Sequence, residues 1–95
     1  MSAAKSTTST TWRRDPSVPF QSLEEETVVV DPSRRQVHLL NDTASRIWAL
    51  LSTPQSLAAL VEALGEEYEA PEDELRAAIE ETVRDFGEKG LLLPA

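Results

Sequence analysis

The amino-acid sequence predicts an α+β fold in which a three-stranded antiparallel sheet is followed by three helices. Runs of β-branched residues separated by turn signals occupy the first half of the chain, and apolar residues recur three and four positions apart in the second half. The stretch VHLLNDTASRIWALL, residues 37–51, joins the two patterns with almost no loop between them. This junction predicts that the last strand is held rigidly against the first helix.

Three segments are expected to form the strands. Residues 17–21 (SVPFQ) give a weak signal, because a proline lacks the amide proton and is restricted to an edge or a strand end. Residues 27–31 (TVVVD) and 36–40 (QVHLL) give stronger signals. Between them, Asp31 followed by Pro32 predicts a turn, since proline presets φ and the Asp side chain can bond to the backbone ahead of it. The second and third strands should therefore form a hairpin at the sheet edge.

Each of the three helices has a start signal and an apolar stripe. Asn41 or Asp42 can cap the first, Ser and Pro residues precede the second, and the third opens at Pro71 with acidic residues at the positive end of its dipole. The third should stop at Gly90, and the apolar segment after it should fold back on the body. The predicted core stripes are Ala44, Ile47, Trp48 and Leu51; Leu57, Leu60, Val61, Leu64 and Tyr68; and Leu75, Ile79, Val83 and Phe86.

The chain divides into a tail, residues 1–16, and one folded domain, residues 17–95. The tail is rich in Ser and Thr, has few core-forming side chains and ends in Asp15-Pro16, so we expect it to be disordered. Its one distinctive feature is Trp12 with Arg13 and Arg14, which we interpret as a flexible tip rather than an anchor for a partner. The remaining residues are enough for a single small core.

Composition disfavours several classes of protein. Cysteine is absent, which excludes disulfides and thiol chemistry and is typical of a cytoplasmic protein. No apolar run approaches the roughly 20 residues of a membrane span, so no membrane contact is expected. The net charge is −8, and residues 62–88 carry eleven carboxylates against two arginines, which disfavours a nucleic acid as partner. These carboxylates could be a solvated surface or could attract a basic peptide.

Groups that carry catalytic chemistry are also scarce. The one histidine, His38, lies in a predicted strand on the opposite face from Val37 and Leu39, and we interpret it as a sheet-surface residue or a peptide contact. Neighbouring acids such as Glu80 and Glu81 point about 100° apart on a helix and cannot share a substrate. No glycine-rich phosphate loop is present. The sequence therefore predicts a non-catalytic protein without a metal or cofactor.

The order of these elements and three local motifs resemble the PqqD-like proteins. The motifs are the hairpin leading into VHLLNDTASRIWALL, the second helix SLAALVEALGEEYEAP and the closing EKGLL, and the likeness covers roughly residues 18–93. DPSRRQ stands where pyrroloquinoline quinone biosynthesis proteins carry a Tyr-Pro-Glu-Gly-like element, and the Gly-x-Tyr-x-x-Leu-Asn pattern common in lasso peptide systems is absent. The resemblance is therefore to the general family, and it leaves the pathway open.

The resemblance implies a fold similar to a winged helix-turn-helix and the function of a recognition element. PqqD-like proteins bind the leader of a ribosomally made precursor peptide, so the implied partners are that leader and a modifying enzyme such as a radical S-adenosylmethionine enzyme, a leader peptidase or a cyclase. The leader is expected to add as a strand beside the third strand, in the groove between it and the third helix. An exposed edge strand suits this mode, because its unpaired amides and carbonyls can accept a guest strand.

On this hypothesis the peptide contacts come from the third strand and the third helix. Arg76, Glu80 and Arg84 follow one another at i+4 and would face polar side chains, although the arginines could instead pair with Glu80. A proline replacing His38 is expected to weaken binding if the His38 amide pairs with the leader. The predicted peptide-binding residues are Gln36, Val37, His38, Leu39, Leu40, Arg76, Ile79, Glu80, Val83 and Arg84, of which Ile79 and Val83 could equally belong to the core.

Two alternatives share the same elements. A winged-helix DNA-binding regulator would need basic or amide side chains on its reading helix, but the second helix has no basic residue and the third is acidic. An assembly subunit without a peptide ligand could use the exposed edge strand as a homodimer contact. Gel shift and light scattering would separate these alternatives from a peptide-binding protein.

Overall fold

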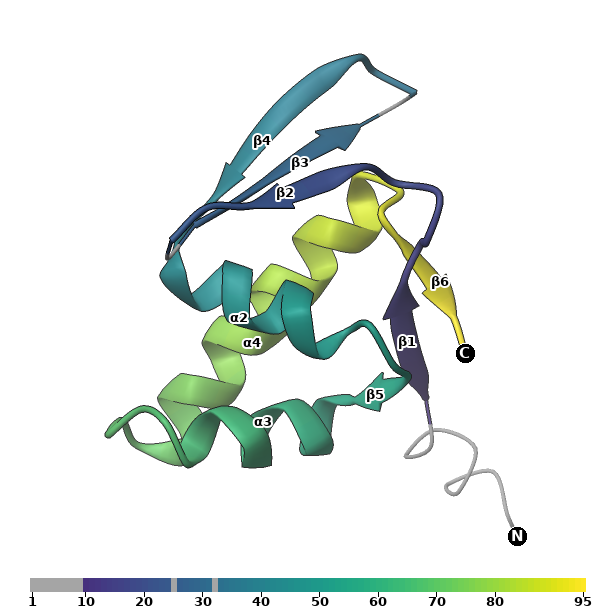
Figure 1. The fold of residues 1–95 in the computed structure, drawn as a ribbon. Helices are drawn as coiled ribbons and strands as arrows, with labels where there is room; N and C mark the ends of the chain where they lie inside the picture. The colour runs from purple at the N-terminus through teal and green to yellow at the C-terminus, as the bar shows by residue number, and fades with distance from the viewer. Residues whose placement is uncertain (1–9, 25, 32) are drawn as a thin grey trace, which may run out of the picture.

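The computed structural model describes residues 10–24, 26–31 and 33–95, which form two small antiparallel sheets and three helices (Figure 1). One sheet has the strand order β2-β3-β4 and the other β5-β1-β6. The strands are β1 (Thr11–Arg14), β2 (Phe20–Ser22), β3 (Thr27–Asp31), β4 (Gln36–Leu40), β5 (Gln55–Ser56) and β6 (Leu92–Pro94), and the helices are α2 (Asp42–Leu50), α3 (Leu57–Gly65) and α4 (Glu72–Glu88). The predicted α+β class is confirmed.

The hairpin of β3 and β4 is held by the side chain of Asp31. This carboxylate is fully buried, and its Oδ1 accepts hydrogen bonds from the backbone amides of Ser33 at 3.1 Å and Arg34 at 3.2 Å. Burial opposes the charge, but the hydrogen bonds from Arg34 and Ser33 outweigh it and hold the pKa of Asp31 below its ordinary value. Arg35 completes the turn with φ of 55°. The predicted role of Asp31 in the turn is thus confirmed, whereas Pro32 lies outside the described residues.

The junction between β4 and α2 is fixed by two side chains. Asn41 is the N-cap, and its Oδ1 accepts a hydrogen bond of 2.8 Å from the amide of Ala44. The buried hydroxyl of Ser45 donates to the carbonyl of Leu40 at 3.2 Å. The end of β4 is therefore tied to the first turn of α2, as the tight junction in the sequence predicts.

Trp48 lies at the centre of the core. Its ring meets those of Phe20 and Phe86 edge to face, at centroid distances of 5.8 and 5.5 Å. The helix stripes predicted from the sequence are buried, with Leu57 and Tyr68 packing at the margin of the core. Complete burial of a Leu, Ile or Phe side chain stabilises a fold by roughly 1.5–3 kcal/mol, so these stripes supply most of the driving force.

Thr11–Arg14 belong to the segment that the sequence predicts to be disordered. In the structure they form β1, the central strand of the second sheet. β1 pairs with both β5 and β6, and Trp12 packs against the core. Arg14 covers the ring of Phe20 at 4.4 Å and donates to the carbonyl of Trp48 at 3.0 Å. This strand escapes local sequence reasoning because its partners lie far along the chain. Residues 1–9 of the predicted tail lie outside the described residues.

The C-terminal segment returns along the body, as predicted. Gly90 has φ of 72°, a left-handed conformation that ends the helical path, and the next residue, Leu91, is fully buried. β6 then pairs with β1, which brings the C-terminus close to the start of the described chain (Figure 1). Among the described helices, none has the length and apolar character needed to span a bilayer.

Candidate functional site

β4 forms one edge of its sheet, because it pairs with β3 on one side and stands last in the strand order. Its exposed side chains include Val37 and Leu39, which are 66% and 61% exposed. Both lie on the outer face of the sheet, opposite Val30 and Val28 of β3. An edge strand with an exposed apolar pair is a surface that soluble proteins usually protect, so its exposure indicates a binding function.

The register identifies which backbone groups of β4 are available. The amide of Val30 donates to the carbonyl of Pro19 on the β2 side, so Val30 turns its backbone groups away from β4. Because backbone direction alternates along an antiparallel strand, Val29 then bonds toward its partner His38. The groups that point to the open edge therefore belong to Val37 and Leu39. The amide of His38 faces β3 and cannot pair with a peptide at the open edge. A proline at His38 therefore does not test strand addition, contrary to the expectation from the sequence.

A groove of about 590 Å³ runs between β4 and α4. Figure 1 shows the sheet above the C-terminal half of α4. Phe86 and Leu40 border the groove but are almost completely buried, so they expose little apolar surface to it. The groove is lined by Leu39, Leu40, Asn41, Ala44, Glu81, Thr82, Arg84, Asp85, Phe86 and Glu88. The open edge of β4 at Leu39 and a mainly polar flank of α4 thus border the same groove.

The helical wall of this groove is acidic. Glu81, Asp85 and Glu88 contribute carboxylates, and Arg84 is the one basic residue among the lining residues. Asp85 is partly neutralised by an ion pair with Lys89. Carboxylates on one wall favour a ligand whose facing side chains are basic.

His38 points to the inner side of the sheet, where it is partly buried. Its Nε2 lies 3.8 Å from Oδ2 of Asp31, and neither atom has a hydrogen-bond partner among the described residues. The prediction that His38 lies on the opposite face from Val37 and Leu39 is confirmed. The interpretation of His38 as an ordinary sheet-surface residue is wrong, because strand alternation turns it toward the buried Asp31.

The structure separates the helix residues that the sequence assigned to one site. Arg76 lies near Glu72, with 3.8 Å between the charged atoms, and borders a different hollow beside α3. Ile79 is fully buried in the core. Glu80 and Val83 line a groove on the β6 side of α4. Of the five predicted helix residues, Arg84 alone borders the groove beside β4.

Sequence reasoning missed the flank of α4 that faces β4. Glu81, Thr82, Asp85 and Glu88 lie beside the buried stripe, but the stripe defines only an inner face and leaves both flanks equivalent. Phe86 lies on the same helical stripe as Leu75, Ile79 and Val83, so no signal in the helix itself distinguishes the two flanks. No cluster of metal-ligating side chains occurs in the described part of the chain.

A small sheet with an open edge strand, facing a helix across a groove, defines a domain that can accept an extended peptide. A family model described as Coenzyme PQQ synthesis protein D (PqqD) matches residues 26–92, and the chain belongs to this family.

Two solved structures share the fold. "TbiB1 in Complex with the TbiA(beta) Leader Peptide" has a TM-score of 0.77 and 22% identity, with 84% of this chain and 93% of that chain covered. "Lasso peptide synthetase B1 complexed with the leader peptide" has a TM-score of 0.74 and 28% identity, with 87% and 98% covered. None of the curated proteins compared matches the chain.

Proposed function

We propose that this protein is a non-catalytic recognition element that binds the leader of a ribosomally made precursor peptide by strand addition at β4. The observation that carries the proposal is the pair of outward-facing backbone positions on β4, Val37 and Leu39, of which Leu39 lines the groove beside α4. Membership of the PqqD family and the two similar proteins solved with leader peptides support it. The bound leader is presented to a modifying enzyme, for which a radical S-adenosylmethionine enzyme, a leader peptidase and a cyclase are candidates.

The site is suited to capture a flexible peptide because its β4 wall is held at both ends before binding. Asn41 and Ser45 tie the end of β4 to α2, and Asp31 fixes its start. A rigid edge lowers the ordering cost on the protein side, so the main-chain hydrogen bonds of the added strand contribute more to affinity.

Strand addition also constrains the leader sequence. Side chains of the added strand alternate between two faces. Those on one face meet the acidic wall of Glu81, Asp85 and Glu88 above Phe86, and those on the other extend the outer surface of Val37 and Leu39. A leader with basic side chains inward and apolar side chains outward fits best, since the basic groups meet carboxylates on α4 and the apolar groups extend the exposed apolar pair of β4.

Charge also argues against the DNA-binding alternative. α3 spans Leu57–Gly65 and exposes Ala58 and Glu62, with no basic side chain along its length. The exposed flank of α4 beside β4 is mainly acidic. Neither helix carries a face that would neutralise phosphates or read base edges.

A proline at Leu39 tests the proposal, because it removes one outward amide while leaving the bonds between β3 and β4 intact. Leu39→Ala is the matched control, since it removes the side chain but keeps the amide. The probes are the TbiA(beta) leader peptide and peptides selected on this protein from a displayed library of random 25-residue sequences, titrated by calorimetry. We expect Leu39→Pro to bind at least tenfold more weakly than Leu39→Ala, because a lost hydrogen bond leaves a peptide carbonyl unpaired.

Circular dichroism and thermal melting establish that both variants are folded. Equal affinities of folded Leu39→Pro and Leu39→Ala would contradict strand addition at this position of β4. Absence of any peptide whose binding depends on Leu39 or Val37 would contradict the proposed function as a whole.

A further inference from the structure

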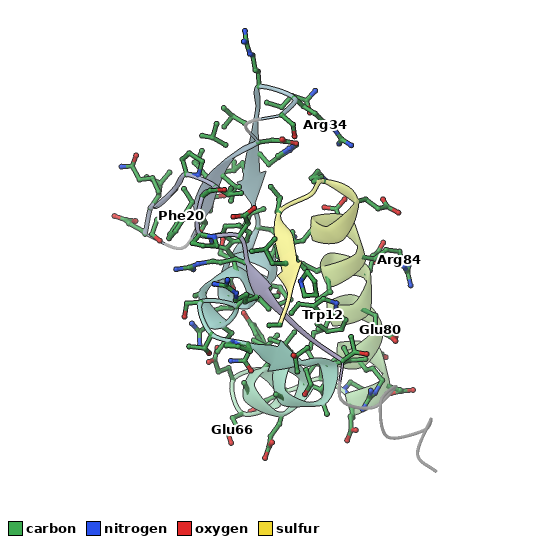
Figure 2. The ribbon with its side chains drawn as sticks, turned by 90° about the vertical axis from the view of Figure 1, so that its right-hand side faces the viewer. Trp12, Phe20, Arg34, Glu66, Glu80 and Arg84 are labelled. Atoms are coloured by element: carbon green, nitrogen blue, oxygen red, sulfur yellow. The ribbon has the colours of Figure 1, made fainter. Side chains whose placement is uncertain are left out.

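A second groove lies on the opposite flank of α4, between this helix and β6. Its volume is about 520 Å³. Its walls are mostly apolar, with Trp12 from β1, Leu57 at the start of α3, Val83 from α4, and the three residues of β6. Figure 2 shows Trp12 between α4 and β6, with Glu80 and Arg84 projecting from the outer side of α4. We call this the β6 groove, lined by Trp12, Leu57, Glu80, Val83, Arg84, Gly87, Leu92, Leu93 and Pro94.

Gly87 keeps the β6 groove open. It lies inside α4, where glycine lowers helix stability relative to alanine. A Cβ added at Gly87 would meet no atom within 4 Å, so crowding in this structure does not require glycine here. The missing side chain instead leaves free space in the wall of the groove. An incoming side chain could use this space.

Two charges stand at the rim without a partner in the described part of the chain. Glu80 and Arg84 are exposed and four residues apart on α4, yet no ion pair joins them. By contrast, Arg76 of α4 and Lys89 at its C-cap each lie within ion-pair distance of an acid. A ligand with an acidic group near Arg84 and a basic group near Glu80 would neutralise both.

The free edge of β6 adds a limited backbone contact. The amide of Asp15 donates to the carbonyl of Leu91, so alternation turns the backbone groups of Leu93 toward β1 and those of Leu92 and Pro94 outward. Pro94 has no amide proton, so long strand addition is blocked and recognition falls mainly to side chains.

We propose that the β6 groove docks an extended segment of the protein partner that acts on the leader-bound complex. The segment carries a large apolar side chain that occupies the space beside Gly87, flanked by an acid and a base for Arg84 and Glu80. The choice of partner rests on the proposed function and on position, because Arg84 borders both grooves. The two grooves are thus separated by one helix, whose diameter is about 10–12 Å. A partner that straddles α4 would contact the groove and the leader together.

Gly87→Leu is the discriminating variant. It fills the β6 groove, improves helix propensity, and leaves the lining of the groove between β4 and α4 unchanged. Ala77→Leu is the matched control, since it adds a Leu side chain at an exposed position of the same helix outside both grooves. Leu39→Pro identifies peptides that bind at β4 instead, because it weakens the binding of those peptides only.

The probe is a displayed library of random 12-residue peptides, selected on the full protein without leader and titrated by fluorescence polarisation. We expect one set of peptides whose Kd rises at least tenfold with Gly87→Leu and is unchanged by Ala77→Leu and Leu39→Pro. These peptides should shift the amide resonances of Gly87 and Leu92 and should bind equally well when a leader saturates β4.

The inference is overturned if no selected peptide is sensitive to Gly87→Leu, or if every sensitive peptide also depends on Leu39. Sedimentation that shows a dimer dissociated by Gly87→Leu would assign the groove to a second copy of this chain and would equally overturn it. Failure of the proposed leader binding at β4 would be seen separately, because no selected peptide would then be sensitive to Leu39→Pro.

Discussion

The guanidinium of Arg34, in the turn between β3 and β4, donates a hydrogen bond of 3.3 Å to the carbonyl of Glu88 at the C-terminal end of α4. A cation at this end of a helix also interacts favourably with the helix dipole. The contact joins the β3–β4 turn to α4 at the hairpin end of the groove between β4 and α4, while Asn41 and Ser45 hold the other end of β4 against α2. The width of the groove therefore depends on residues at both ends.

Replacing Arg34 with alanine should loosen the hairpin end of the groove. Loss of one hydrogen bond, worth about 0.5–1.5 kcal/mol, predicts a decrease of about two- to tenfold in leader affinity by calorimetry. The control is Arg35→Asn, which removes one positive charge from the same turn and keeps a residue that tolerates a positive φ. A similar loss in both variants would attribute the effect to net charge rather than to the contact with Glu88.

Asp31→Asn should change how stability depends on pH. Because the pKa of folded Asp31 lies below its ordinary value of about 3.9, the ionised carboxylate stabilises the fold above that pH, and this contribution is lost as pH falls through the folded pKa. The melting temperature of Asp31→Asn should therefore lie below that of the wild type at pH 6–7. The gap should close in the acid range below about pH 4. A gap that stays constant from pH 7 to pH 3 would mean that the charge is not responsible.

Glu81→Lys should weaken binding of a leader that carries basic side chains facing α4. Like charges then meet across the groove, and we expect an affinity about three- to tenfold lower at low salt, since charge pairs at interfaces contribute on the order of 1 kcal/mol. The loss should shrink at 0.5 M salt because of screening. Glu66→Lys makes the same charge change at an exposed position at the end of α3, outside the groove (Figure 2). Equal effects of both variants would exclude a local role for the acidic wall.

Trp12→Ala should destabilise the protein, whereas a residue in a disordered tail would have no effect. The ring packs against the core but is only partly buried, so we expect a loss of about 1–3 kcal/mol in the free energy of unfolding, below the value for a fully buried aromatic. Trp12→Phe should recover much of this loss. Chemical denaturation of the three proteins provides the measurement, and unchanged midpoints would contradict the packing of β1 on the body.

Local patterns predicted the elements whose signals are short in range. TVVVD and QVHLL became strands with the bounds expected from the sequence, and Asn41, one of the two predicted candidates, is the N-cap of α2. β1 was missed because its four residues pair with Gln55–Ser56 and Leu92–Pro94, and a strand whose partners lie so far along the chain leaves little local signal.

For the candidate site too, the sequence predicted the strand but not the orientation of its residues. The sequence predicted the strand at Gln36–Leu40, and the family resemblance implied that this strand is the docking edge; the strand order of the structure places it at the edge of its sheet. The sequence could not decide that Val37 and Leu39, rather than His38, turn their amides outward, since that depends on the register with β3 and β2. The same holds for α4, where helical periodicity defines the buried stripe but leaves both flanks equivalent.

By itself, the sequence determined the α+β class, the hairpin, the caps and the buried faces, because propensities, turn residues and apolar spacing act over a few neighbouring positions. Only the tertiary structure decided that Glu81 and Asp85 face β4 while Glu80 and Gly87 face β6. The physical reason is that the strand facing each flank of α4 depends on how its whole buried stripe packs on elements distant in sequence, as in the contact of Phe86 with Trp48 of α2.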